Sequence, residues 1–327
     1  MTDQNQTDTE AQQGSLPVVI FFLGKGGVGR STAAASFAYD RSVNHHEKVL
    51  VVQWSIKDMV SPLLDGKEAG HKHVEVLPGL FVMNYNADEA MREYFVEHLN
   101  MGMFYRFVLE NQQVQKLIHA APGLEELFFL GRLFWLVELA KEERGIHFDR
   151  IIIDSPATGH GTALFGVAAT ISRFKLQGPL VSETTRVAGM LEDAAKVGTA
   201  IVTLPEELPV EETLEMIPKI EADLNRPPLF ILLNRSLTPL LLGGILTSTQ
   251  FSNEFNNRCR SLTNPTSRIT IEAVQGDLAR RLEYEKKLRE SVSIPVIAMP
   301  DQMIVAPDIG GVHRIAELSK SFARVSQ

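Results

Sequence analysis

A glycine-rich turn between residues 24 and 32 constrains this chain more than any other segment. Its residues are, in order, Gly24, Lys25, Gly26, Gly27, Val28, Gly29, Arg30, Ser31 and Thr32. An apolar run from Val18 to Leu23 precedes the turn, and a helix-compatible stretch from Ala33 to Tyr39 follows it. A strand, a glycine-rich turn and a helix start together allow backbone N–H groups to close around phosphate oxygens. The segment is therefore predicted to be a nucleotide-binding phosphate loop.

Two positions in this turn carry unusual chemistry. Lys25, second in the loop, marks a variant in which a lysine reaches the nucleotide of a facing subunit; the simpler alternative is a surface lysine. Arg30 occupies the position at which the pattern G-x-x-x-x-G-K-[ST] has its lysine. Arginine keeps the positive charge, but its guanidinium is longer, planar and wider than an ammonium group. We therefore expect phosphate attraction to survive and the geometry of phosphate transfer to suffer.

The composition limits the partners and the compartment. The 327 residues include 32 Lys and Arg against 40 Asp and Glu, a net charge of −8. Nucleic-acid binding and polybasic membrane anchoring both need a basic surplus, so neither is expected. No apolar stretch approaches the roughly 20 residues that span a bilayer, so the chain is predicted not to be integral to a membrane and to be cytoplasmic. The lone cysteine, Cys259, rules out internal disulfides.

Short apolar runs alternate with helical patterns along the chain. The predicted strands are Val18–Leu23, Val49–Gln53, Leu80–Met83, Ile151–Asp154, Thr199–Leu204, Leu229–Asn234 and Ile294–Ala298. Apolar strands that alternate with helices indicate parallel βαβ units covered on both faces. The predicted fold class is α/β, with the doubly wound, mostly parallel sheet of a P-loop NTPase. Ligands on such sheets bind beyond the carboxyl ends of the strands.

Three segments depart from this alternating pattern. Residues 1–16 are predicted to form a disordered tail, because they offer almost nothing to bury. Residues 87–145 read as a helical pair, and residues 236–264 as a second irregular stretch. We predict one P-loop domain over residues 17–327, with a helical subdomain built from these two insertions.

The run Ile151–Asp154 is a buried-strand pattern that ends in a carboxylate. Alone, this pattern is better explained by a residue that caps the end of a strand. Beside a phosphate loop, the Asp154 carboxylate and the Ser31 hydroxyl are candidate ligands for Mg²⁺ against the nucleotide phosphates.

The residues after Asp154 read Ser155, Pro156, Ala157, Thr158, Gly159, His160 and Gly161. Together with the Lys25-type loop, this D-x-P-x-T-G-H pattern resembles the arsenical-pump and tail-anchored-protein-targeting ATPases. Residues 122–126 and 204–213 resemble two further segments of that family. The resemblance implies an ATPase that uses ATP or ADP with Mg²⁺ and forms a dimer in which Lys25 acts in trans. It also implies that the Asp154 segment is switch II. Two adenine contacts are implied as well: Asn234, and Pro300 in the loop 295–301.

The chain departs from this family after the second predicted strand. The family has a carboxylate there that orients or activates the attacking water, whereas this chain has Ser55. Asp58 lies three residues later and would need a loop rearrangement to substitute. A serine lacks the carboxylate's ability to position water or accept its proton. With Arg30, the predicted catalytic set of Lys25, Asp154 and Ser55 is therefore expected to hydrolyse ATP slowly.

Two further patterns leave structural alternatives. The stretch Leu124–Ala140 is apolar nearly all round, so it is either a buried helix or part of a groove for an apolar client. The pairs His45-His46 and His71-Lys72-His73 lack a metal-ligand context and are expected in solvated loops.

Three functions remain open. The chain is an ATP-binding subunit that acts with a paralogue, a competent homodimeric ATPase that drives transport or targeting, or a non-enzymatic, nucleotide-gated module for an apolar client.

Overall fold

The computed structural model describes residues 16–93, 96, 123–156, 164–166, 179–239, 265–302 and 308–323. The predicted N-terminal tail apart from Leu16, most of both insertions, the Thr158–His160 segment and Cys259 lie outside the described residues.

The described strands form one eight-stranded sheet with the order β3-β4-β2-β5-β1-β6-β7-β8. They are β1 (Val19–Leu23), β2 (Val49–Gln53), β3 (Val74–Leu77), β4 (Leu80–Asn84), β5 (Arg150–Asp154), β6 (Val197–Thr203), β7 (Phe230–Ser236) and β8 (Val296–Pro300). Neighbours pair in parallel except β3 and β4, which form an antiparallel hairpin. All seven predicted strands are present with ends shifted by at most two residues, so the predicted fold class is confirmed.

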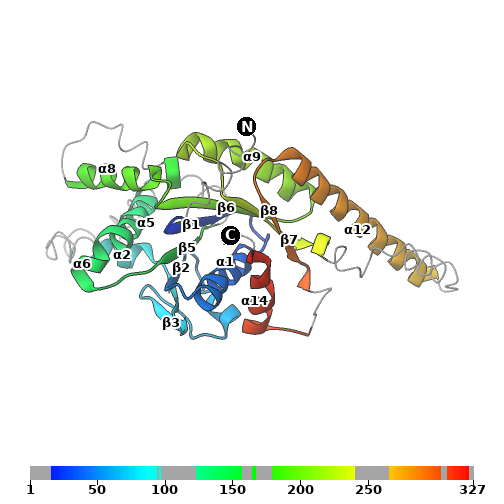
Figure 1. Ribbon diagram of the computed structural model, residues 1–327, viewed down its shortest axis with the longest axis horizontal. Coiled ribbons are helices and arrows are strands. Elements are labelled where there is room, and N and C mark those ends of the chain that lie inside the picture. The colour runs from blue at the N-terminus through cyan, green and yellow to red at the C-terminus, as the bar shows by residue number, and fades with distance from the viewer. Residues whose placement is uncertain are drawn as a thin grey trace, which may run out of the picture.

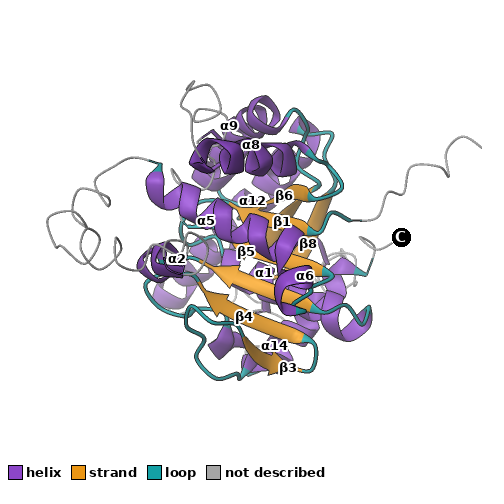
Figure 2. Ribbon diagram, turned by 90° about the vertical axis from the view of Figure 1, so that its left-hand side faces the viewer, coloured by secondary structure: helices purple, strands orange, loops and turns teal. Residues whose placement is uncertain are grey.

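Helices cover both faces of the sheet (Figures 1 and 2). They are α1 (Arg30–Tyr39), α2 (Ala87–Glu93), α5 (Leu124–Phe134), α6 (Ala140–Arg144), α8 (Pro179–Glu192), α9 (Glu207–Leu224), α12 (Pro265–Ser291) and α14 (Gly311–Ser319), with short turns η1 (Asp40–Asn44), η2 (Ser61–Leu64), η5 (Trp135–Leu139) and η6 (Lys320–Phe322). One core lies beneath α1 and α14, and the other beneath α5, α8 and α9. The amino-terminal half of α12 extends away from the sheet (Figure 1).

The central strand β1 shows why the sheet is covered on both faces. Its side chains alternate between the two cores, yet all five are buried. Phe21 packs edge-on against Phe165 with ring centroids 5.1 Å apart, while Phe22 lies 5.6 Å from Phe37 of α1. A strand that is apolar on both faces cannot lie at a solvated surface, so it fixes the two helical layers.

The apolar stretch Leu124–Ala140 is part of the core. It forms α5, η5 and the start of α6, and most of its apolar side chains pack into the same cluster as β1 and β5. Phe129 stacks on Trp54, with centroids 5.3 Å apart and planes 17° apart. Of the two interpretations of this stretch, the structure supports the buried helix.

The expectation of solvated histidines is wrong for His71. This side chain is buried, its Nδ1 accepts a hydrogen bond from the Asn86 N–H at 3.2 Å, and its Nε2 lies 3.4 Å from a Glu93 oxygen. His73 is only partly exposed and meets the ring of Phe81 edge-on. His71 and His73 lie just before β3, in the segment that connects the β2 loop to the β3–β4 hairpin. Their contacts come from residues after that segment, so a local sequence pattern does not reveal them. His45 and His46 are exposed, as expected.

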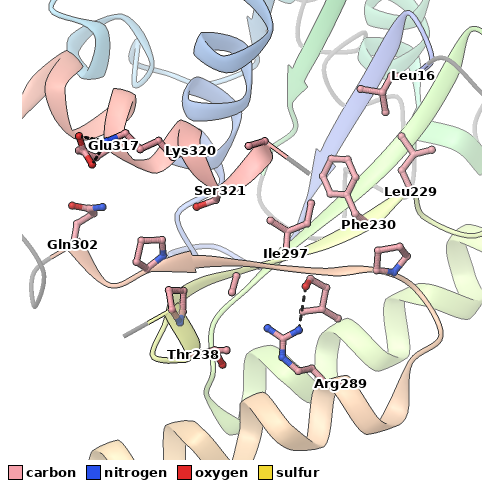
Figure 3. Close-up of a pocket in the computed structure, with 16 residues that line it drawn as sticks. Leu16, Leu229, Phe230, Thr238, Arg289, Ile297, Gln302, Glu317, Lys320 and Ser321 are labelled. Atoms are coloured by element: carbon pink, nitrogen blue, oxygen red, sulfur yellow. Dashed lines mark hydrogen bonds and ion pairs between the residues drawn. The ribbon is translucent and has the colours of Figure 1, made fainter. Parts of the chain in front are cut away.

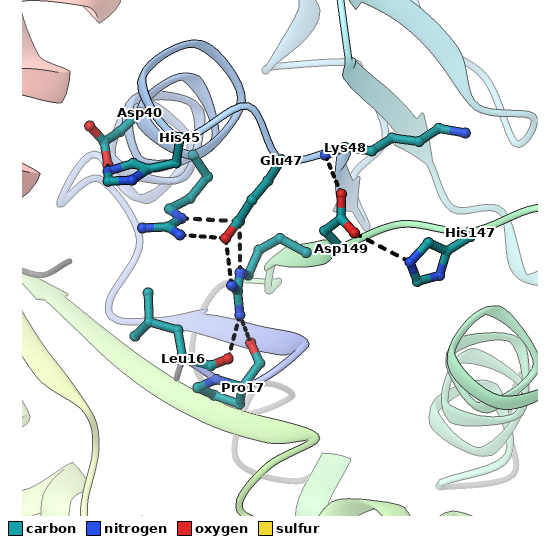
Figure 4. Close-up of polar contacts among 10 residues, drawn as sticks. Leu16, Pro17, Asp40, His45, Glu47, Lys48, His147 and Asp149 are labelled. Atoms are coloured by element: carbon teal, nitrogen blue, oxygen red, sulfur yellow. Dashed lines mark hydrogen bonds and ion pairs between the residues drawn. The ribbon is translucent and has the colours of Figure 1, made fainter. Parts of the chain in front are cut away.

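A partly buried carboxylate, that of Glu47, joins the amino ends of the central strands (Figure 4). Glu47 accepts hydrogen bonds from Arg41 and from Arg150, the first residue of β5. The Arg150 guanidinium also donates to the carbonyls of Leu16 and Pro17, just before β1. Burial would raise the pKa of Glu47, but hydrogen bonds and positive charge from the two arginines outweigh it and lower that pKa to about 2.

Glu47 should therefore make the stability of the wild type depend on pH, and replacing Glu47 should remove that contribution. A depressed folded-state pKa stabilises the fold above the unfolded value of 4.5, and this contribution is lost as the pH falls toward 2. Glu47→Gln should lower the free energy of unfolding at pH 7 by about 3 kcal/mol. Urea denaturation between pH 7 and pH 3 measures this, with the exposed Glu68→Gln as control. An equal difference between wild type and Glu47→Gln at both pH values would contradict the account.

Candidate nucleotide-binding site

The turn between β1 and α1 is closed by two glycines that cannot be replaced without strain. Gly24 has φ 147° and Gly29 has φ 88°, both in the region that favours glycine. A Cβ on Gly24 would lie 2.3 Å from the Val202 carbonyl oxygen, and one on Gly29 would lie 2.3 Å from Asn234 Nδ2. The turn is thus wedged between the ends of β6 and β7.

Within this turn the predicted phosphate-binding residues lie together. Gly26 and Gly27 are exposed, Val28 is buried, and α1 begins at Arg30. Ser31 and Thr32 occupy the first turn of α1, where the helix leaves backbone N–H groups without intrahelical acceptors. Exposed loop amides and a helix start are the groups that bind phosphate oxygens.

Arg30 lies across the turn and links it to the segment after β5. Its guanidinium Nη1 donates to the Gly24 carbonyl at 2.7 Å and to the Pro156 carbonyl at 2.8 Å. Burial lowers the pKa of Arg30, while the negative charge of Asp154 acts in the opposite direction. An arginine nevertheless stays charged. The cation at the lysine position is therefore held by two backbone oxygens, one from each of two loops.

Ser31 and Asp154 form the predicted metal-binding pair. The Ser31 hydroxyl donates to Asp154 Oδ2 at 2.5 Å, and Asp154 Oδ1 is buried without a hydrogen-bond partner. Burial raises the pKa of Asp154 above its usual range, against the opposing hydrogen bond from Ser31 and the charge of Arg30. A hydroxyl beside an unpartnered carboxylate oxygen fits Mg²⁺, which prefers oxygen ligands. Among the described residues no three His, Cys, Asp or Glu side chains form a metal cluster, so phosphate and water oxygens would have to complete the shell.

The loop after β2 contains the predicted catalytic Ser55 and the nearby Asp58. The Ser55 hydroxyl donates to the Lys57 carbonyl, so it is turned into its own loop. Asp58 is buried and accepts hydrogen bonds from the N–H groups of Val60, Ser61 and Ala69 and from the Gln53 amide. Burial raises the pKa of Asp58, but these hydrogen bonds outweigh it and lower that pKa. Asp58 therefore organises the loop and does not take the position of the missing carboxylate.

Lys25 projects from the turn toward α9. Its Nζ lies 2.6 Å from Glu212 Oε1, and both side chains are about one third exposed. Glu212 lies in the 204–213 segment that resembles the family, but no local pattern marks it as a functional residue.

Asn234 and Pro300, the predicted adenine contacts, lie at the ends of β7 and β8. Asn234 donates its amide to the Val28 carbonyl at 2.9 Å and so joins β7 to the phosphate loop. Pro300 lines a hollow of about 1040 Å³ beside the edge strand β8, along with Thr238 and Gln302 (Figure 3). The contacts of both residues with adenine stay predictions.

A family model described as anion-transporting ATPase matches residues 18–178. The chain is 27% identical over 219 residues to ATPase BagA of Mycobacterium tuberculosis, covering 65% of this chain and 64% of that protein. It is 25% identical over 227 residues to a putative arsenical pump-driving ATPase of Aquifex aeolicus, covering 61% and 74%. It is also 25% identical over 214 residues to ATPase GET3 of Rhodotorula glutinis, covering 64% and 58%.

The predicted resemblance is confirmed, because residues 18–178 match the anion-transporting ATPase family and the relatives include ATPase GET3 and an arsenical pump-driving ATPase. The match spans 64% of the length of the mycobacterial relatives. No helix in the described part of the chain is both long and apolar enough to cross a membrane.

If Asp154 holds the metal, its carboxylate charge should matter only when Mg²⁺ is present. Asp154→Asn should weaken the Mg²⁺-dependent gain in ATP affinity by roughly tenfold or more, while affinity in EDTA stays near the wild-type value. In the wild type this gain should grow as the pH rises through the raised pKa of Asp154, because Mg²⁺ binds the deprotonated form. Calorimetry tests both points, with Asp149→Asn, before the amino end of β5, as control. An unchanged Mg²⁺ effect in Asp154→Asn would exclude this carboxylate as the ligand.

Proposed function

We propose that this chain is the ATP-binding subunit of a dimeric ATPase of the arsenical-pump and tail-anchored-protein-targeting family. Its own hydrolytic site is weakened by Arg30 and Ser55, and its Lys25 acts in trans on a partner subunit, a paralogue or a second copy. It binds ATP or ADP with Mg²⁺ and works in the cytoplasm, without nucleic acid. Its domain runs over residues 17–327, with the helical subdomain drawn from residues 87–145 and 236–264.

The observation that carries this proposal is the contact of Arg30 with two carbonyls. A phosphate-binding lysine is a compact charge on a flexible stem, whereas a planar guanidinium held at Gly24 and Pro156 has a fixed direction. Loop amides and the start of α1 still offer their N–H groups to phosphate. Binding therefore persists, while stabilisation of the transferring phosphoryl group, which depends on position, is reduced.

The β2 loop supports slow hydrolysis independently. At the loop position where the family has a water-orienting carboxylate, this chain has Ser55. The Ser55 hydroxyl donates a hydrogen bond to the Lys57 carbonyl. The nearby carboxylate of Asp58 is buried and hydrogen-bonded within the loop. Activating water there would require a carboxylate that this loop does not present.

Exposed apolar side chains near Lys25 support a facing subunit. Ile56 is fully exposed, Met59 is 54% exposed, and Leu208 is 65% exposed. Ile56 and Met59 follow β2 and Leu208 follows β6, so they lie at the same edge of the sheet as Lys25 and on either side of it. Apolar residues gathered at one edge favour a protein partner there. The burial of α5 removes the main sequence argument for an apolar-client groove, so the client-binding module is the weaker alternative.

Restoring the two exchanged residues should raise turnover. Arg30→Lys with Ser55→Asp returns a compact cation and a carboxylate to the site, so the double variant should hydrolyse ATP at least tenfold faster than the wild type. Steady-state phosphate release measures the rate, and Asn86→Asp, at an exposed position just after the neighbouring strand β4, controls for an added charge. A competent ATPase is the correct reading if the wild-type chain alone turns over at ~1 s⁻¹ or faster.

Removing Lys25 should affect the assembly more than nucleotide binding. A positive charge brought to a partner's phosphates acts mainly in the transition state, so Lys25→Ala should lower the turnover of the mixed dimer about tenfold or more, with little change in ATP affinity. The exposed Lys57→Ala at the same edge is the matched control, and light scattering checks assembly. Normal dimers with unchanged turnover would reduce Lys25 to an ordinary loop residue.

A further inference from the structure

The lysine assigned a role on a partner subunit is held within its own chain. Lys25 Nζ lies 2.6 Å from Glu212 Oε1, and Glu212 belongs to α9, which follows β6. Because β6 is the neighbour of β1 in the sheet, α9 starts beside the phosphate loop. Lys25 cannot contact Glu212 and a partner's phosphates with the same geometry, so the two positions exclude one another.

Glu212 is more than a surface counter-ion. Its second oxygen, Oε2, is buried and has no hydrogen-bond partner among the described residues. The hydrogen bond to Lys25 is therefore the one that this carboxylate accepts among the described residues. The pair is nevertheless about one third exposed, so water and salt weaken it.

We propose that Glu212 is the resting-state acceptor of Lys25, holding it in cis in the free protomer and releasing it when a nucleotide-loaded partner presents phosphate charge. The idea rests on the proposed function, because the trans role of Lys25 belongs to it. Glu212 is thus a positioning residue that sets how readily the free protomer commits to assembly. A pair of this exposure biases an equilibrium by roughly two- to fivefold, which several phosphate charges can outweigh.

The neighbouring residue provides a matched control. Glu211, on the same helix, pairs with Lys287 of α12, and both of these side chains are about half exposed. Glu211→Gln and Glu212→Gln therefore remove the same charge from adjacent positions and each break one ion pair. Only Glu212→Gln frees Lys25.

The first measurement uses the free chain without nucleotide. Lysine acylation followed by mass spectrometry reports how available the Lys25 amine is, and Glu212→Gln should raise its labelling rate by about two- to fivefold. Glu211→Gln should leave Lys25 at the wild-type rate and raise labelling of Lys287 instead. Equal Lys25 labelling in wild type and Glu212→Gln would overturn the proposal, whatever the fate of the proposed function.

The second measurement is association with Mg·ATP, followed by sedimentation velocity for each variant with a wild-type partner. Glu212→Gln should lower the half-association concentration by about two- to fivefold relative to Glu211→Gln, and Glu212→Asp, which keeps the charge, should stay near wild type. If labelling rises in Glu212→Gln but association matches Glu211→Gln, the release step is wrong. Failure of the proposed function would give a different result. No variant would associate, although the Lys25 labelling rate would still differ between Glu212→Gln and Glu211→Gln.

Discussion

The structure of this site depends on how closely the backbone packs at the carboxyl end of β1. A methyl group on Gly24 would clash with the Val202 carbonyl, and one on Gly29 with the Asn234 amide, so the turn can be built only from glycine at these positions. This packing places the start of α1 against the ends of β5, β6 and β7. Ser31 then meets Asp154, Arg30 reaches Pro156, and Asn234 holds the Val28 carbonyl. The predicted phosphate loop, the Ser31–Asp154 pair and the lysine that points to α9 all depend on this one closely packed turn.

In this arrangement the groups expected to bind the nucleotide phosphates differ from those expected to promote hydrolysis. The groups that attract phosphate are backbone amides and a helix start, which the exchange at Arg30 leaves in place. The groups that act on the reacting phosphoryl and the water are side chains, and here the chain has an arginine bound to carbonyls and a serine turned into its own loop. Under the proposed function, a site of this kind would retain nucleotide and convert it slowly. The Lys25–Glu212 pair fits the same division, because it concerns what the loaded subunit offers to a partner.

Local sequence patterns predicted the parts of the structure that depend on local chemistry. Apolar runs predicted seven strands. The glycine turn and the carboxylate after Ile153 predicted that the site lies at the carboxyl ends of β1 and β5. The edge strand β3 was missed because Val74 and Val76 form only a short, half-exposed alternation. Tertiary relations were not visible. The burial of His71 and the partner of Lys25 each depend on a separate segment of the chain. The structural use of Asp58 depends on how its own loop folds back on itself. The resemblance covered the 204–213 segment but gave no reason to single out Glu212.

The central claim, that this chain binds ATP well and cleaves it slowly, is tested most directly by the fate of ATP bound in a single turnover. The chain, in excess over radiolabelled Mg·ATP, is rapidly freed of unbound nucleotide, and the bound label is analysed over time. The account predicts that most bound label stays ATP for far longer than the ~1 s within which an efficient enzyme turns over. Bound label that appears as ADP within that time, or no label retained by the excess chain, would contradict it.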